Sequence, residues 1–138
     1  MPIRYEIDAE VGLILVELSG PVSAAEIFDY YATLAADASV RPGLAVLADC
    51  RGVTSGPSFL DVYGLATSKP QLPVHLRPNR AAVIVKQGWL FGIVRQFAAL
   101  ADRGGVRVMP FVEPGEARRW LLRPVESVTP ARPENEQL

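Results

Sequence analysis

The chain has 138 residues, 49% of them hydrophobic, and its 14 basic and 15 acidic side chains leave a net charge of −1. This length suits one domain with its own core, and the balanced charge argues against a nucleic-acid or anionic-membrane partner. One cysteine excludes a disulfide framework, and one histidine argues against a zinc or iron site.

The N-terminal part predicts a hairpin followed by a capped helix. Residues 3–8 alternate apolar and polar side chains, as in a strand with one wet face, and residues 13–18 form a nearly continuous apolar strand. After a break at 19–21, Ser23 and Glu26 have the spacing of a capping box, so we expect a helix to begin there. Apolar residues then recur at helical spacing and predict the side that packs on the core.

The rest of the chain alternates strands and helices. The runs 44–48 and 81–85 are apolar at every position and stop at polar residues, which is typical of parallel strands covered on both faces. Helices are expected at 57–68, 89–102 and 116–122, and a last strand at 106–112. The order β-β-α-β-α-β-α-β-α predicts an α/β fold with a single mixed, mostly parallel five-stranded sheet and flanking helices.

The chain is expected to be one cytoplasmic domain with a tail. The domain spans residues 1–123, and residues 124–138, which are rich in proline and charge, form a flexible polar tail. No apolar run reaches the roughly 18 residues of a membrane-spanning helix. The first ten residues lack the pattern of a secretory signal, so we expect neither a transmembrane segment nor a leader.

Several short strings follow one another in a fixed order over about residues 3–122. They are Tyr5-Glu6-Ile7, Leu18-Ser19-Gly20-Pro21-Val22, Leu47-Ala48-Asp49 with Arg51, Ala82-Val83-Ile84-Val85 before Trp89, and Phe111 with Glu116-Ala117 and Trp120-Leu121. In this order and spacing they resemble the SpoIIAA-like, or STAS/SEC14-like, domains, which are relatives of anti-anti-sigma factors and of the lipid-binding SEC14 (CRAL-TRIO) fold. The resemblance implies a small α/β domain without catalytic activity.

The two branches of this family imply different binding roles. The anti-anti-sigma branch carries a phosphorylatable serine in an Asp-Ser-Ser-Gly-type loop. Here Ser55 and Gly56 match that loop in place, whereas Thr54 departs from it and Pro57 follows. The SEC14-like branch implies a lipid or another apolar ligand between the sheet and its helices, and no residue motif of this chain matches it.

Candidate site residues fall at the expected carboxyl ends of the strands, where open α/β sheets bind ligands. Asp49, Arg51, Ser55 and Trp89 are predicted to contact a ligand there, and Ser55 is also the candidate for regulatory phosphorylation. Structural alternatives remain for each. Asp49 and Arg51 form an ion pair or hold loop N–H groups, Ser55 and Gly56 cap the following helix, and Trp89 belongs to the core.

No catalytic group is predicted. Cys50 would need a base beside it to act as a nucleophile, and the one histidine, His75, lies in a separate proline-rich loop. Phosphate-binding and hydrolase motifs are absent, so neither a cofactor nor a metal is expected.

The sequence therefore predicts a non-enzymatic binding or protein-interaction domain. Its partner is expected to be another protein or a small apolar or amphiphilic ligand in a sheet–helix cleft. Apolar residues in the loop 69–79 also leave a homodimer open. Two alternatives remain: a phospho-regulated switch that uses Ser55, and an unrecognised enzyme that uses Asp49, Arg51 and Cys50.

Overall fold

The computed structural model describes residues 3–56, 80–102 and 107–123. In these ranges the chain forms five strands and three helices. The elements are β1 (Ile3–Asp8), β2 (Leu13–Pro21), α1 (Ala24–Ala36), β3 (Ala45–Ser55), β4 (Arg80–Ile84), α3 (Trp89–Asp102), β5 (Arg107–Phe111) and α4 (Pro114–Leu122).

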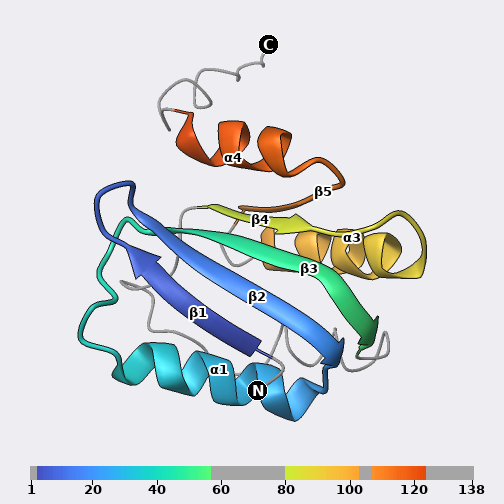
Figure 1. Cartoon of the computed structure of the whole chain (residues 1–138), viewed down its shortest axis with the longest axis horizontal. Helices are drawn as coiled ribbons and strands as arrows, with labels where there is room; N and C mark the ends of the chain where they lie inside the picture. Colours follow the sequence, from blue (N-terminus) through green and yellow to red (C-terminus); the bar gives the residue numbers. More distant parts are fainter. Residues whose placement is uncertain (1–2, 57–79, 103–106, 124–138) are drawn as a thin grey trace.

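All five strands belong to one sheet, in which the spatial order is the chain order, β1-β2-β3-β4-β5 (Figure 1). β1 and β2 form an antiparallel hairpin with Ile3 opposite Leu18. The other three neighbouring pairs are parallel. The predicted α/β fold, with a mixed and mostly parallel five-stranded sheet, is therefore confirmed.

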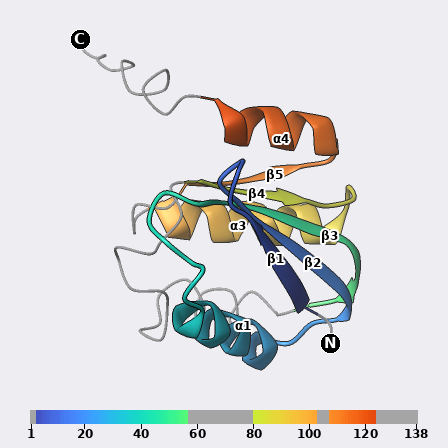
Figure 2. The same cartoon turned by 60° about the vertical axis from the view of Figure 1, so that its left-hand side comes forward.

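Helices lie on both faces of the sheet (Figure 2), and each face has its own hydrophobic cluster. We call the two faces the α1/α3 face and the α4 face, after the helices that cover them. One strand contributes to both clusters because its successive side chains point to opposite faces. The first cluster includes Ile14, Val16, Ala48 and Val85 of the strand region and Leu34 of α1. The second includes Leu13, Ala82 and Ile84 with Ala117 and Leu121 of α4.

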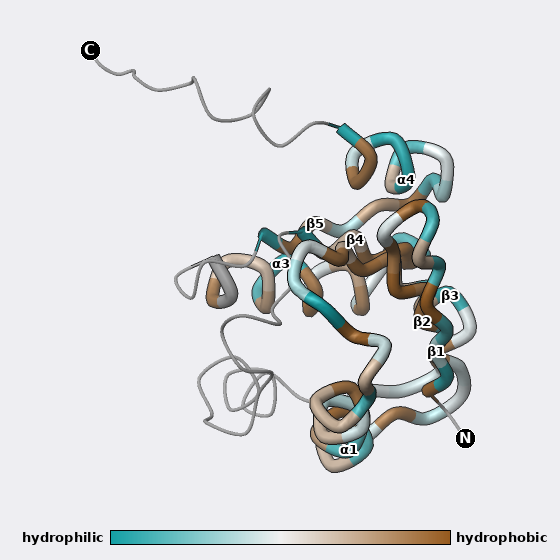
Figure 3. The backbone as a smooth tube through the Cα atoms, turned by 90° about the vertical axis from the view of Figure 1, so that its left-hand side faces the viewer, coloured by the Kyte–Doolittle hydropathy of each residue, from teal (hydrophilic) through white to brown (hydrophobic). Residues whose placement is uncertain are grey.

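The α4 face is only partly covered by the described helices. α4 contacts β3, β4 and β5. The central strands carry many of the most hydrophobic residues (Figure 3). β1 presents Arg4, Glu6 and Asp8 on this face, since each is opposite a β2 residue of the same face. Arg4 pairs with Glu17 at 2.5 Å, and both side chains are well exposed. The wet strand face expected for residues 3–8 is this one.

The start of α1 follows the predicted capping box. Ser23 is the N-cap, and its hydroxyl accepts a hydrogen bond from the Glu26 N–H. In return, the Glu26 carboxylate accepts the Ser23 N–H at 2.8 Å. Val22 before the cap is buried, and Ile27 packs against the same cluster, so this entry anchors the helix to the α1/α3 face.

Two strands are longer than predicted. β3 does not stop before Asp49 but runs to Ser55, and β2 runs through Pro21. These extensions form because the two strands pair with each other beyond the buried part of the sheet, ending with Pro21 opposite Ser55. The Val22 N–H then donates to the Ser55 carbonyl at 2.9 Å. The predicted helix 57–68 and the predicted tail 124–138 lie outside the described residues.

Candidate functional site

Asp49 and Arg51 form a bidentate ion pair within β3. Arg51 Nη2 lies 2.7 Å from Asp49 Oδ2, and Arg51 Nε lies 3.0 Å from Asp49 Oδ1. Asp49 Oδ1 also accepts the Arg51 backbone N–H at 3.1 Å. The hydrogen bond from the Arg51 side chain is the main reason why the pKa of the Asp49 carboxyl is lowered, against the opposing effect of partial burial. The structure thus shows the ion-pair alternative, and a ligand contact by these two residues stays a prediction.

β3 contains a β-bulge at this ion pair. Glu17 and Ser19 of β2, two positions apart, face Asp49 and Gly52 of β3, three positions apart. Asp49 and Arg51 are two positions apart in β3, the spacing that places side chains on one face of a strand, and their side chains form two hydrogen bonds there. Glycine suits position 52 at this bulge because a Cβ there would lie only 3.2 Å from the Ser19 Cβ, closer than most side-chain contacts. The sequence prediction placed the pair at the end of the strand, whereas β3 continues beyond both residues to Ser55.

Trp89 lies beside Gly56, the residue that follows Ser55, at the carboxyl edge of the sheet. Ser55 is the last residue of β3 and is exposed, and Gly56 follows it. A Cβ on Gly56 would lie 3.6 Å from Cη2 and 3.8 Å from Cζ3 of the Trp89 ring, so the indole lies beside this backbone. Trp89 is 54% exposed, which excludes the core position. It is the first residue of α3 and follows Gly88, whose φ of 126° suits glycine.

The four predicted site residues therefore form two pairs. Asp49 shares the α4 face with Glu17, its partner in β2. The pKa of Arg51 is raised mainly by its hydrogen bond to Asp49 and by the Asp49 charge, with a smaller effect of Glu113 just before α4. Ser55 and Trp89 lie farther along, at the carboxyl edge beside α3. Ser55 and Trp89 lie at the carboxyl edge, as predicted. Asp49 and Arg51 do not, because β3 continues past them to Ser55.

Cys50 lies in the interior. It is 8% exposed and belongs to the cluster on the α1/α3 face, on the opposite side of β3 from Asp49. Burial, with a smaller effect of the Asp49 charge, raises the pKa of the Cys50 thiol to about 12. A thiol with this pKa is protonated at neutral pH and is a poor nucleophile. His75 lies outside the described residues.

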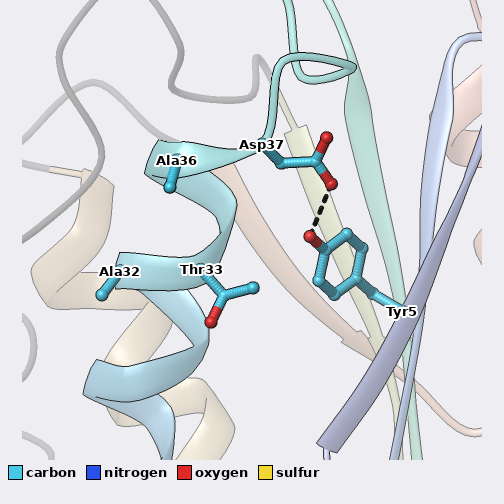
Figure 4. A pocket seen from close by; sticks show the side chains of 5 residues that line it. All are labelled: Tyr5, Ala32, Thr33, Ala36 and Asp37. Carbon is cyan, nitrogen blue, oxygen red and sulfur yellow. Dashed lines mark hydrogen bonds between the residues drawn. The ribbon is translucent and has the colours of Figure 1, made fainter.

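Sequence reasoning missed a shallow depression between β1 and the end of α1 (Figure 4). Its volume is about 550 Å³, and it is lined by Tyr5, Ala32, Thr33, Ala36 and Asp37. The Tyr5 hydroxyl donates to Asp37 Oδ2 at 2.6 Å. This bond is the main reason why the pKa of Tyr5 rises to about 12 and why that of Asp37 is lowered. The depression is open, and small side chains form its helical wall.

Arg80 is another feature that sequence reasoning missed: a buried arginine that joins β4 to the end of α4. It is 3% exposed, and its guanidinium donates to the carbonyls of Trp120 and Arg123 at the end of α4. An arginine at the start of an apolar strand gives no sequence signal for this, because its partners lie 40 and 43 residues further along the chain.

The described parts of the chain contain neither a metal-binding cluster nor a membrane-spanning helix. Among residues 3–56, 80–102 and 107–123, no three His, Cys, Asp or Glu side chains lie close enough together to hold a metal ion. None of the helices in the same ranges is long and apolar enough to cross a membrane.

Comparisons with known proteins bear on the fold alone. No family model matches the chain, and no curated protein does. Among solved structures, the chain is similar to an uncharacterized protein from the DUF3478 family with a SpoIIAA-like fold, from Shewanella loihica PV-4. The two are 18% identical with a TM-score of 0.52, over 86% of this chain and 91% of the other. The resemblance drawn from the sequence is thus confirmed for the architecture: the chain has a SpoIIAA-like fold.

Proposed function

We propose that the chain is a non-catalytic, cytoplasmic interaction domain that binds a protein partner at the carboxyl edge of its sheet. The observation that carries this proposal is the exposed indole of Trp89 beside Gly56. Tryptophan is enriched among the residues that dominate binding energy at protein interfaces. Val112, which directly follows β5, is 41% exposed and adds apolar surface at the carboxyl edge.

A protein partner fits this geometry better than an enclosed apolar ligand. Ligand pockets typically bury most of a small molecule between concave walls. Among the described residues, the depression beside Tyr5 is shallow and open, and the best-buried strand residues on both faces are packed into the two hydrophobic clusters. An exposed edge with an aromatic side chain offers contact area without a cavity.

The absence of catalysis is part of the proposal and rests on two side chains. The Cys50 thiol is buried with its pKa raised to about 12, and the Asp49 carboxylate is engaged by Arg51. An enzyme built on these residues would require Cys50 to react with a thiol reagent in the folded protein. Rapid labelling of Cys50 under native conditions, at the rate of an exposed thiol, would support the enzyme alternative.

Site-specific photocrosslinking in cells tests the docking edge. A benzoylphenylalanine at position 89 is expected to give a protein adduct, whereas the same group at the exposed Thr33, on α1, is the matched control. An adduct of two copies of this chain would identify the partner as a homodimer. Equal adduct yields at 89 and 33, or none at 89, would overturn the proposal.

A phospho-regulated switch at Ser55 is the second candidate. Its supporting observation is the position of the exposed Ser55 next to Gly56, beside which the Trp89 ring lies. A phosphate there would place about two negative charges next to the proposed docking edge. Ser55→Asp is expected to change the adduct yield at position 89, with Ser55→Ala as the control. If the two variants give the same yield, Ser55 does not act as a switch.

A further inference from the structure

Three arginines converge where β4 and β5 begin and α4 ends. Arg80 and Arg107 are paired residues of neighbouring parallel strands, so their side chains start from the same face of the sheet. Arg80 Nη2 donates to the carbonyl oxygen of Arg123 at 2.9 Å, which brings the backbone of Arg123 to the same place. Arg107 and Arg123 are exposed, whereas Arg80 lies behind them and is buried.

The buried member of this arginine cluster is held in a fixed position. The Arg80 guanidinium donates to two carbonyls of the α4 end and lies 5.6 Å from the centre of the Trp120 ring. Its hydrogen bonds fix the backbone on which Arg123 is carried. An anion site that includes Arg80 is preorganised, because the Arg80 guanidinium is already held in place before an anion binds.

Within the described residues, no ion pair with an acid balances the positive charge of the cluster. β4 and β5 contain no acidic residue, and the one acid of α4, Glu116, lies in its first turn, away from the cluster. Within the described ranges the ion pairs are Arg4–Glu17 and Arg51–Asp49, both elsewhere. The carbonyls at a helix C-terminus supply only about half a negative charge. Burial and the like charges of Arg107 and Arg123 lower the pKa of Arg80, yet an arginine stays charged at neutral pH.

We propose that Arg107 and Arg123, with Arg80 behind them, bind the phosphate dianion of a small phosphorylated molecule. Guanidinium groups match phosphate oxygens with paired hydrogen bonds. A dianion offsets more of the three converging positive charges than a single carboxylate does. The site lies at the start of β4 and β5, and Trp89 lies beyond the opposite end of β4, so this inference is independent of the proposed function.

An NMR titration of the full chain with inorganic phosphate at about pH 7.5 tests the site. The Nε–H signals of Arg107 and Arg123 are expected to shift and saturate. Arg107→Gln and Arg123→Gln should each weaken binding roughly tenfold, since a hydrogen bond to a charged group is lost. Arg118→Gln is the matched control, because Arg118 is an exposed arginine in the same helix outside the cluster. Its affinity should equal that of the original chain.

A second arm separates a dianion site from general attraction to positive charge. Phosphate monoesters take up a proton with a pKa near 6, whereas sulfate stays a dianion and the arginines stay charged. Lowering the pH to about 5 should therefore weaken the binding of phenyl phosphate and leave sulfate binding unchanged. Equal weakening by all three Gln variants, or signals that drift without saturation, would overturn the proposal. Amide spectra of each variant confirm that it is folded.

Discussion

Gly88 and Gly92 lie four residues apart, and each has open space where a Cβ would be. Their backbones differ, because Gly88 has φ of 126° at the turn before α3, whereas Gly92 lies inside the helix. Gly88→Ala should lower the free energy of unfolding by about 1–3 kcal/mol, since the new side chain is strained in that conformation.

Gly92→Ala is the control and should raise the free energy of unfolding by up to about 1 kcal/mol, because alanine is the better helix former. Urea denaturation of both variants measures the difference. If Gly88→Ala were as stable as Gly92→Ala, the positive φ at Gly88 would be wrong.

The Asp49–Arg51 pair predicts a specific dependence on acid. Its carboxyl pKa is lowered in the folded chain, so the pair stabilises the fold above the ordinary Asp pKa of about 4. This contribution is lost as the pH falls through the folded pKa. It should be at most about 1 kcal/mol, because both side chains are partly exposed. Carbon-detected NMR titration should show the Asp49 pKa rising in Arg51→Gln, while that of Asp37 stays unchanged.

Tyr5 predicts the opposite dependence, on base. Its pKa is raised to about 12 by the bond to Asp37, then by burial and the Asp37 charge. The neutral phenol therefore stabilises the fold below the ordinary Tyr pKa of about 10, and this contribution is lost as the pH rises towards 12. Tyr5→Phe should make stability less sensitive to pH in this range. An unchanged alkaline limb in thermal unfolding curves would contradict the Tyr5–Asp37 bond.

At the scale of the elements, the C-terminal end of α4 is held by one arginine of strand β4, Arg80. Arg80→Met keeps an apolar stem but leaves the carbonyls of Trp120 and Arg123 without their donor. The expected loss is about 2 kcal/mol, the value typical of hydrogen bonds from a charged group. Arg80→Lys should recover part of it. Amide hydrogen exchange should speed up most in α4, and equal acceleration in α1 would contradict this local role.

The elements differ in how far the sequence predicted them. The start of α1 was predicted because its cap uses two residues three positions apart, Ser23 and Glu26, which any reader of the sequence can see. The length of β3 was not, because its polar end is a strand only by pairing with β2. The bulge at Asp49 and Arg51 depends on the same pairing. Local signals are thus readable, whereas those that require a neighbouring strand are not.

For the whole molecule, alternation and apolar runs were enough to predict the sheet and its mostly parallel strands. The candidate site was predicted only in part. The rule for carboxyl ends placed Ser55 and Trp89 correctly at that edge, and the exposure of Trp89 could not be predicted from a helix whose following residues are apolar. The arginine cluster remained hidden because it joins residues from three separate elements.

The identity of chain order and sheet order has a consequence for synthesis on the ribosome. The β1–β2 hairpin emerges first, and each later strand pairs with the edge left by the one before it. The sheet can therefore grow in the direction of translation without a strand being inserted between two others. The last strand to arrive, β5, contains Pro110, which lacks an N–H donor and suits a final edge. Among the described strands, β5 is thus the last to pair, with β4 as its neighbour.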